Sequence, residues 1–471
     1  MVNENRLTTE EKALKINLTP DIYGCFAEIG AGQEVAANFF QAGASSGTIA
    51  YTQSAYDMKV SDSMYGPTNR YVCEERLTMM LFTEYETMRY RLPEKAKNCR
   101  FFAFCNTVES LNYHKTNQGQ GWVGLRYQLH KDKKPNDIIL HVKMHDNNNV
   151  AQQEALGILG VNLLHAAYFH TDKLEDFLEA LVDRLPRERI EIDMLRFTGP
   201  DFDNVDNRMI ALNLVKTGMT DATMFDLCGN VMQPSEALYK KNILLVRGRF
   251  RPVTKVHLDM IENGKNQFLL EEGVNEDNVS VIFELTIHGL TNDGIISDKD
   301  FIDRVALLGS LGHTVMISNY GQHYSMVEYL SALSRNRLIG LMVNVTNVHT
   351  IFDESYYYDL PGGLFQALGQ GFGRNVKMFV YPCLDEHGNL QTFEDLEVAP
   401  KSVALLQYMK DNNKIEGIKN FNEALLPILP AHVIEKISKN DTSWENDVPE
   451  EVSKAIKFFH LFGYKPEMTQ A

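Results

Sequence analysis

The alternation of short β-rich runs with helical stretches, from about residue 138 onward, restricts the fold of this 471-residue chain most strongly. Apolar and β-branched runs that alternate with amphipathic segments indicate βα units around a parallel sheet. About eight such units over about 250 residues are typical of a (β/α)8 barrel. We therefore expect an α/β protein with a barrel-like core, in preference to an open doubly wound sheet. The predicted strands are 138–144, 190–197, 221–225, 243–246, 279–285, 314–318, 339–345 and 376–381.

The first of these strands has an alternative interpretation. Residues 122–129 and 138–144 could pair as a hairpin across the polar segment between them, and the barrel would then lose one strand. The stretch before residue 131 lacks the βα repeat, and the chain becomes helical beyond Pro382. We predict an N-terminal α+β region (1–130), a βα-repeat core domain (131–385) and a helical C-terminal region (386–471).

A glycine turn near the N-terminus is a second local feature. Residues 26–40 are typical of a strand, a turn containing Gly30 and Gly32, and a helix. The third glycine of the dinucleotide-binding fingerprint is missing, which favours a tight structural turn over a cofactor site.

Composition excludes several functional classes. The net charge of −16 disfavours binding to nucleic acid or to an anionic membrane, because both require basic surface. The six cysteines show no C-x-x-C pairing, which disfavours a zinc ribbon and a disulfide framework and favours a reducing compartment. The N-terminal residues lack the apolar core of a signal peptide, so we expect a cytoplasmic protein. We predict no metal site formed by the protein, and we expect a homo-oligomer.

The segment 243–261 contains the strongest sequence indication of a ligand-binding or catalytic site. Four apolar residues lead into a turn with Gly248 and Pro252, and Thr254 and His257 then open an apparent helix. A strand, a turn and a helix N-terminus form an arrangement that binds anions. The alternative is a structural turn in which Thr254 caps the helix and the nearby arginines are solvated.

Written as G-x-F-x-P-V-T-x-x-H-L-D, this segment resembles the T/H-x-G-H signature of nucleotidyltransferases such as nicotinate-nucleotide and pantetheine-phosphate adenylyltransferases. The resemblance implies that Thr254 and His257 are catalytic, and it places Val256 where the family has glycine. It also implies an open sheet with the motif after its first strand. The second family signature, I-S-S-T-x-x-R, is matched in part by residues 317–323, which keep Ser318 and have His323 in place of arginine.

Other phrases resemble a bacterial family whose members are labelled nicotinate-nucleotide adenylyltransferase or TonB-dependent receptor. These phrases are residues 26–35, residues 191–200 and the segment from Tyr239 into the turn. We expect the receptor label not to apply, because neither an export signal nor the amphipathic strand repeats of an outer-membrane receptor are visible in the sequence.

We therefore expect a cytosolic enzyme that acts on a nucleotide or phosphorylated metabolite. Its most specific form is adenylyl transfer from ATP to a mononucleotide such as nicotinate mononucleotide, with Mg²⁺ bridging the triphosphate. Two alternatives stay open: a barrel enzyme of unrelated chemistry that uses the turn as a phosphate or carboxylate clamp, and a non-catalytic self-assembling protein. The candidate residues are His257 and Thr254 for catalysis; Arg247, Gly248, Arg249, Arg251 and Ser318 for phosphate binding; and His145, Arg196, Glu284, Asn319 and Asn344 at other strand ends.

Overall fold

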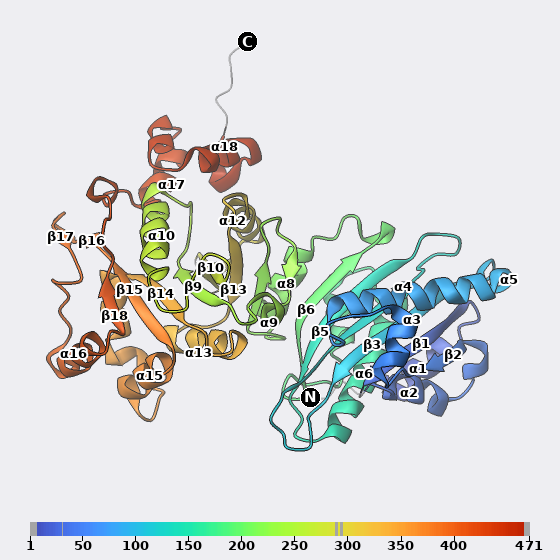
Figure 1. Cartoon of the computed structure of the whole chain (residues 1–471). Helices are drawn as coiled ribbons and strands as arrows, with labels where there is room; N and C mark the ends of the chain where they lie inside the picture. The colour runs from blue at the N-terminus through green and yellow to red at the C-terminus, as the bar shows by residue number, and fades with distance from the viewer. Residues whose placement is uncertain (1–6, 31, 288–290, 293–294, 466–471) are drawn as a thin grey trace, which may run out of the picture. The chain divides into compact units, whose positions relative to one another are not determined.

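The computed structural model describes residues 7–30, 32–287, 291–292 and 295–465. The chain divides into two compact units, the first ending at Thr220 and the second beginning at Asp221. Each unit has its own sheet (Figure 1). No helix within the described residues is long and apolar enough to cross a membrane.

The first unit is built on a mixed six-stranded sheet. Its first three strands in spatial order are parallel, and the remaining neighbours pair antiparallel. In spatial order the strands are β2 (Ile49–Gln53), β1 (Ile22–Gly30), β3 (Arg100–Glu109), β4 (Gly119–Tyr127), β5 (Asn136–Met144) and β6 (Ile190–Thr198). The helices are α1 (Thr9–Asn17), α2 (Glu34–Ala42), α3 (Met58–Tyr65), α4 (Glu74–Arg91), α5 (Pro93–Ala96), α6 (Asn149–Phe169), α7 (Leu174–Leu181) and α8 (Asn207–Lys216).

Alternation along β3 explains the layers of this unit, because successive side chains of a strand point to opposite faces. Phe102 and Phe104 are buried in the core that α1, α2, α6 and α7 share with the sheet. Phe101 and Ala103 point the other way and pack with Tyr85 of α4. Helices therefore cover both faces of the sheet.

The second unit is built on an eight-stranded sheet that contains six parallel strands. In spatial order the strands are β18 (Ile415–Gly417), β15 (Val376–Tyr381), β14 (Ile339–Asn344), β9 (Asn242–Arg247), β10 (Val279–Thr286), β13 (Thr314–Ser318), β7 (Ala222–Phe225) and β8 (Val231–Met232). Only the last two run antiparallel to their neighbours. Among the six parallel strands, β9 comes first along the chain, β10 and β13 extend the sheet in one direction, and β14, β15 and β18 extend it in the other. This is a doubly wound sheet whose order reverses between β9 and β14.

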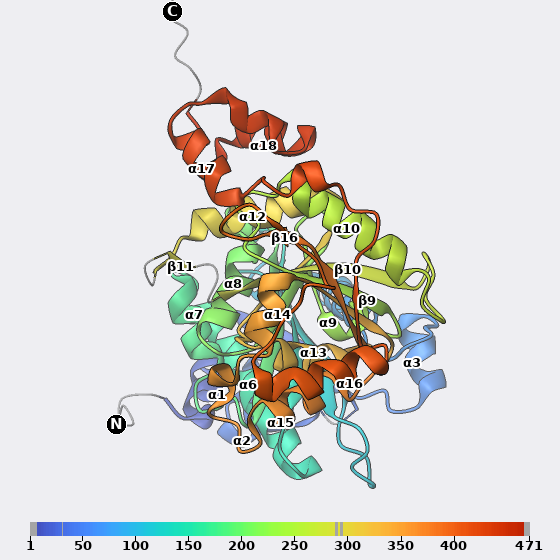
Figure 2. The same ribbon diagram turned by 90° about the vertical axis from the view of Figure 1, so that its left-hand side faces the viewer.

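Helices lie on both faces of this sheet (Figure 1 and Figure 2). Leu341 of β14 belongs to the core formed with α13, α15 and α16, whereas its neighbour Met342 packs against Gly264 of α10. The helices are α9 (Pro234–Ala237), α10 (Lys255–Phe268), α12 (Asp298–Ser310), α13 (His323–Leu333), α14 (Val345–Ile351), α15 (Gly363–Phe372), α16 (Val403–Asp411), α17 (Pro430–Ser438) and α18 (Glu450–Phe459). Short strand pairs are formed by β11 (Thr291–Asn292) with β12 (Ile295–Ile296) and by β16 (Cys383–Leu384) with β17 (Leu390–Gln391).

All eight predicted strands are present, and the α/β class is correct, but the closed barrel is not confirmed. The described strands form open sheets with unpaired edges. Two of the eight, β5 and β6, pair antiparallel in the first unit, and β7 is antiparallel in the second. The hairpin alternative is confirmed, because β4 pairs with β5 and places Trp122 opposite His141. Apolar runs mark where strands occur, whereas the partner of each strand depends on contacts far away in the chain.

Candidate functional site at the carboxyl edge of the second sheet

Three predicted residues converge where β9, β10 and β13 end side by side. The Nε atom of Arg247 lies 3.0 Å from Oε2 of Glu284. Ser318 Oγ donates a 2.6 Å hydrogen bond to Oε1 of the same carboxyl group. The guanidinium group of Arg247 also donates to the carbonyl oxygen of Tyr320. Parallel strands bring their carboxyl ends to one edge, which explains why residues so far apart in the sequence meet.

The charges at this edge are nearly balanced. Burial raises the pKa of Glu284, while Arg247 and the hydrogen bond from Ser318 oppose that rise. Desolvation, together with the charge of Arg247, lowers the pKa of His323 to about 3, so this imidazole is neutral at pH 7. The Nη1 atom of Arg247 is buried and has no hydrogen-bond partner among the described residues. Arg247 is therefore held firmly in place, and one of its donor atoms remains unused.

The turn after β9 is ordered by the burial of one aromatic ring. Phe250 is in the left-handed region (φ 45°) and is only 2% exposed. Its ring centroid lies 4.9 Å from that of Phe283 and 5.3 Å from that of His257. The amide of Gly248 donates to the carbonyl oxygen of Glu284 at 3.2 Å. These contacts therefore fix the conformation of the turn that precedes α10.

The start of α10 fixes the hydrogen-bonding role of His257. The amide of Thr254, the N-cap residue, donates to Nδ1 of His257 at 3.0 Å. Desolvation lowers the pKa of His257 to about 4, so its ring is neutral at pH 7. Because Nδ1 accepts a hydrogen bond, the ring proton resides on Nε2, which becomes a donor. One first-turn amide is already satisfied, since Lys255 N donates to the carbonyl oxygen of Asp447 at 3.0 Å.

The two remaining arginines of the turn differ in availability. Arg251 Nε lies 3.0 Å from Oδ1 of Asp300, and the same carboxylate also accepts a hydrogen bond from Arg304. Arg249 is exposed and forms no ion pair within the part of the chain that the structure describes. Of the three arginines, Arg249 is thus the one whose charge is free to meet an anion.

Several other predicted residues serve local structure. Asn344 ends β14 and caps α14 by accepting a 2.8 Å hydrogen bond from Asn347 N. The amide of Asn319 donates to the carbonyl oxygen of Asp221 at 2.8 Å. These two residues lie at the same edge of the sheet as Arg247.

His145 and Arg196 belong to the first unit, so they are not part of the edge formed by β9 and β10. His145 Nε2 lies 3.3 Å from Glu191, and Arg196 pairs with Glu74. Both residues lie near the carboxyl ends of their strands. Because β5 and β6 are antiparallel, His145 and Arg196 therefore lie toward opposite ends of this strand pair. His141 and Lys143 contact Asp193, a carboxylate partner that the sequence had not indicated.

Near the glycine turn of the first unit, the carboxyl group of Glu28 on β1 lies at the N-terminus of α2. Glu28 accepts 3.2 Å hydrogen bonds from the amides of Val35 and Ala36 at the start of α2, and Asn106 donates to it at 3.3 Å. Burial raises the pKa of Glu28 to about 8, against the opposing effect of those donors. The position where a phosphate would bind is therefore filled by a side chain, which supports the structural interpretation of this turn.

Asp300 and Tyr320 were missed by sequence reasoning, although they contact the predicted residues Arg251 and Arg247. Asp300 lies 49 positions from Arg251, and Tyr320 lies 73 positions from Arg247 and contributes only a carbonyl oxygen. Asp447, whose carbonyl oxygen accepts from Lys255, was missed as well. No local pattern marks such contacts. Among the residues whose placement is described, no group of three His, Cys, Asp or Glu side chains is arranged to hold a metal ion.

No protein-family model and no curated protein matches the sequence. Among solved structures, the chain is similar to the competence/damage inducible protein CihA from Agrobacterium tumefaciens, with 18% identity over 34% of this chain and 94% of that chain and a TM-score of 0.25. A competence or damage-inducible protein from Enterobacter asburiae aligns with 13% identity over 35% of this chain and 99% of that chain, also with a TM-score of 0.25. A competence-damaged protein (CinA) superfamily protein from Enterobacter cloacae aligns with 11% identity over 35% and 93% of the two chains and a TM-score of 0.24. TM-scores this low carry no argument about fold or function.

Proposed function

We propose that the second unit binds a nucleotide or phosphorylated metabolite where β9 and β14 end, and that its most specific activity is adenylyl transfer from ATP to a mononucleotide such as nicotinate mononucleotide. One observation carries the proposal. The turn 248–254 follows the first parallel strand of a doubly wound sheet, beside the point where the strand order reverses. Open α/β sheets bind their ligands at this point. The resemblance to nucleotidyltransferases implies the same location for the motif.

The chemistry of such a transfer depends on positioning and on donors for the charge that develops on phosphate oxygens. Arg249 supplies an exposed cation, and His257 supplies a neutral Nε2–H donor. Thr254 acts as a positioning residue, because its amide holds the ring of His257 in the donor tautomer. The carboxyl groups nearest the turn, Glu284 and Asp300, are already engaged by arginines. Mg²⁺ would therefore arrive with the triphosphate rather than bind first to the protein.

Ligand-induced stabilisation tests this proposal directly. We would measure the melting temperature of the wild type, His257→Ala and Arg249→Ala with ATP/Mg²⁺, nicotinate mononucleotide, phosphopantetheine and inorganic phosphate. A ligand present at about 100 times its Kd stabilises the folded state by about 2.7 kcal/mol, which corresponds to about 5–10 °C for a unit of this size. Arg337→Ala is the matched control, because Arg337 is also exposed but precedes β14 at the opposite edge of the sheet.

The expected result is a shift with ATP/Mg²⁺ or a mononucleotide that both site variants lose and the control keeps. A pyrophosphate-release assay with the ligands that shift would then test adenylyl transfer. The absence of a shift with every ligand would contradict nucleotide binding at this turn.

A second candidate function is favoured by a different observation. Several polar groups around the turn are engaged with one another, through the contacts of Glu284 and Asp300 and the hydrogen bond from Lys255 to Asp447. Contacts of this kind are also expected of a structural turn in a non-catalytic self-assembling protein. That protein would form large homo-oligomers by light scattering and would show no response to any of the four ligands.

A further inference from the structure

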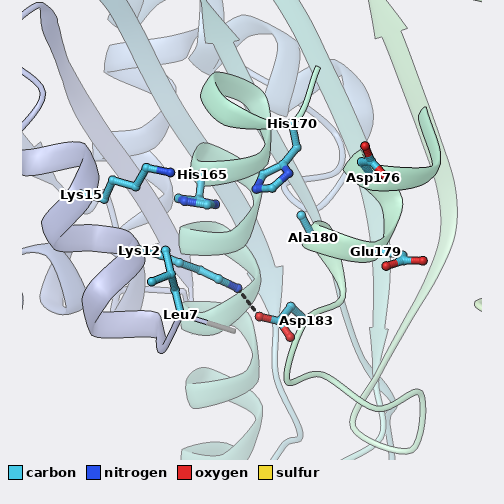
Figure 3. Close-up of a pocket in the computed structure, with 9 residues that line it drawn as sticks. All are labelled: Leu7, Lys12, Lys15, His165, His170, Asp176, Glu179, Ala180 and Asp183. Carbon is cyan, nitrogen blue, oxygen red and sulfur yellow. Dashed lines mark hydrogen bonds and ion pairs between the residues drawn. The ribbon is translucent and has the colours of Figure 1, made fainter. Parts of the chain in front are cut away.

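A polar pocket of about 440 Å³ lies in the first unit, between α1, α6 and α7. Its volume falls within the range of small-molecule sites. Figure 3 shows Lys12 and Lys15 entering from α1, His165 from α6, and Asp176 and Glu179 from α7. The walls therefore carry basic groups on one side and acidic groups on the other.

The framework of this pocket is fixed by a buried polar cluster. Lys12 Nζ donates to Oδ1 of Asn162 at 2.7 Å and to Oδ2 of Asp183 at 2.6 Å (Figure 3). Asn162 Nδ2 in turn donates to the carbonyl oxygens of Leu181 and Asp183 at 3.1 and 2.7 Å. These bonds tie α1, α6 and the end of α7 together, so the pocket is preformed and Lys12 is already paired.

His165 is the feature that points to a ligand. The residue is only 3% exposed, yet neither of its ring nitrogens has a hydrogen-bond partner in the described part of the chain. Buried polar atoms almost always have partners, so two orphan nitrogens on one ring require an explanation. The ring packs between Phe169 and His170, with centroid distances of 5.0 and 5.2 Å, and it lines the pocket.

The protonation state of His165 narrows the chemistry of the ligand. Burial, together with the charges of Lys15, His170 and Lys12, lowers the pKa of His165 to about 3. The ring is therefore neutral at pH 7, with one nitrogen that donates a hydrogen bond and one that accepts. An acidic group of a ligand can accept a hydrogen bond from the protonated ring nitrogen.

The charged groups at the rim indicate which charges a ligand would carry. The ammonium group of Lys15 lies 4.0 Å from the ring centroid of Phe169, and no hydrogen bond from it is formed to the described residues. On the opposite wall, Asp176 is exposed and forms no ion pair within the described chain. A cation and a carboxylate thus face one pocket without being paired to each other.

We propose that this pocket binds a small zwitterion, whose carboxylate or phosphate group is received by Lys15 and His165 and whose amine is received by Asp176. The proposal concerns the first unit and does not depend on nucleotide binding by the second.

Titration calorimetry on the full-length chain tests the proposal with matched probes. The carboxylate series is 4-aminobutyrate, butyrate and butylamine; the phosphate series is phosphoethanolamine, inorganic phosphate and ethanolamine. We expect one zwitterion to bind with a Kd of about 1 mM or below, and its two partial analogues to bind at least about tenfold more weakly. The series that contains the binder identifies the anionic group.

Three variants locate the binding. Lys15→Met removes an exposed charge and keeps the length of the side chain, whereas His165→Phe removes both orphan nitrogens and retains a ring beside Phe169. Each of these two substitutions should weaken the binding of the zwitterion about tenfold or more. Asp176→Asn should lower the affinity for the zwitterion to the affinity for its anionic analogue. Lys59→Met, at an exposed lysine of α3, is the matched control and should leave binding unchanged.

Three results would overturn the proposal: neither zwitterion binds at about 10 mM, an anionic analogue binds as tightly as its zwitterion, or Lys15→Met leaves the affinity unchanged. Since Lys15 is on the surface, its variant is expected to fold even where His165→Phe does not, and Trp122 fluorescence reports the folding of both.

Discussion

Replacing Glu191 with glutamine should remove a pH-dependent part of the stability of the first unit. Glu191 lies on β6, is only 7% exposed, and is surrounded by donors. Thr220 Oγ1 donates to it at 2.6 Å, and Lys143 Nζ and His145 Nε2 each lie 3.3 Å from its carboxylate oxygens. The carboxylate is therefore stabilised in its charged form in the folded protein and loses these partners on unfolding.

The magnitude follows from the pKa of this group. Burial alone would raise the pKa, but the hydrogen bond from His145, the charge of Lys143 and the hydrogen bond from Thr220 lower it from 4.5 to about 2. Each pKa unit corresponds to about 1.4 kcal/mol, so the folded state gains about 3 kcal/mol from ionised Glu191. A lowered pKa gives stability that is present above about pH 4.5 and is lost as the pH falls toward 2.

Urea unfolding followed by tryptophan fluorescence measures this contribution. The chain has two tryptophans, and Trp444→Phe leaves Trp122, a fully buried residue of β4, as the reporter of the first unit. In that background, Glu191→Gln should be about 3 kcal/mol less stable than its parent at pH 7, and the difference should vanish near pH 2. Glu175→Gln is the control, because Glu175 is an exposed residue of α7 and should show no such difference.

Taking the difference between two proteins at each pH cancels the titration of groups that are distant from Glu191. A difference that stays constant between pH 7 and pH 2, or one smaller than about 1 kcal/mol at pH 7, would refute the reasoning.

Two further predictions concern the same unit and use the same reporter. Gly30→Ala should destabilise it by about 3 kcal/mol, because Gly30 has φ 83° and an added Cβ would lie 2.0 Å from the carbonyl oxygen of Val108. Gly43→Ala, at φ 79° but with open space around it, should cost only about 1 kcal/mol, and equal losses would contradict the steric argument. The pKa of Glu28, raised from 4.5 to about 8 by burial, predicts that stability falls as the pH rises from about 5 toward 8, because the unfolded state releases this proton while the folded state retains it. A Glu28→Gln variant with the same slope would assign that fall to another group.

The candidate site was predictable in part. Gly248, Thr254 and His257 lie close together in the chain. The turn and the start of the helix that contain them follow from local backbone preferences. Glu284 was predicted only as a polar residue at a strand end, and Ser318 as a phosphate-binding residue. The contacts of Glu284 with Arg247 and with Ser318 could not be anticipated. Asp300 left no signal, because it lies in the first turn of α12, where acidic residues are common in any helix.

The sequence by itself determined where the eight predicted strands lie. Apolar runs such as 243–246 and 376–381 bury both faces of a strand, and this pattern is a property of consecutive residues. Only the tertiary structure decided which strands pair: β5 and β6 joined the first sheet antiparallel, and β18 extended the second, so two open sheets formed where a barrel was expected. The physical reason is that strand pairing and buried ion pairs are made between residues distant in the chain, and a local apolar pattern leaves the choice of partner open.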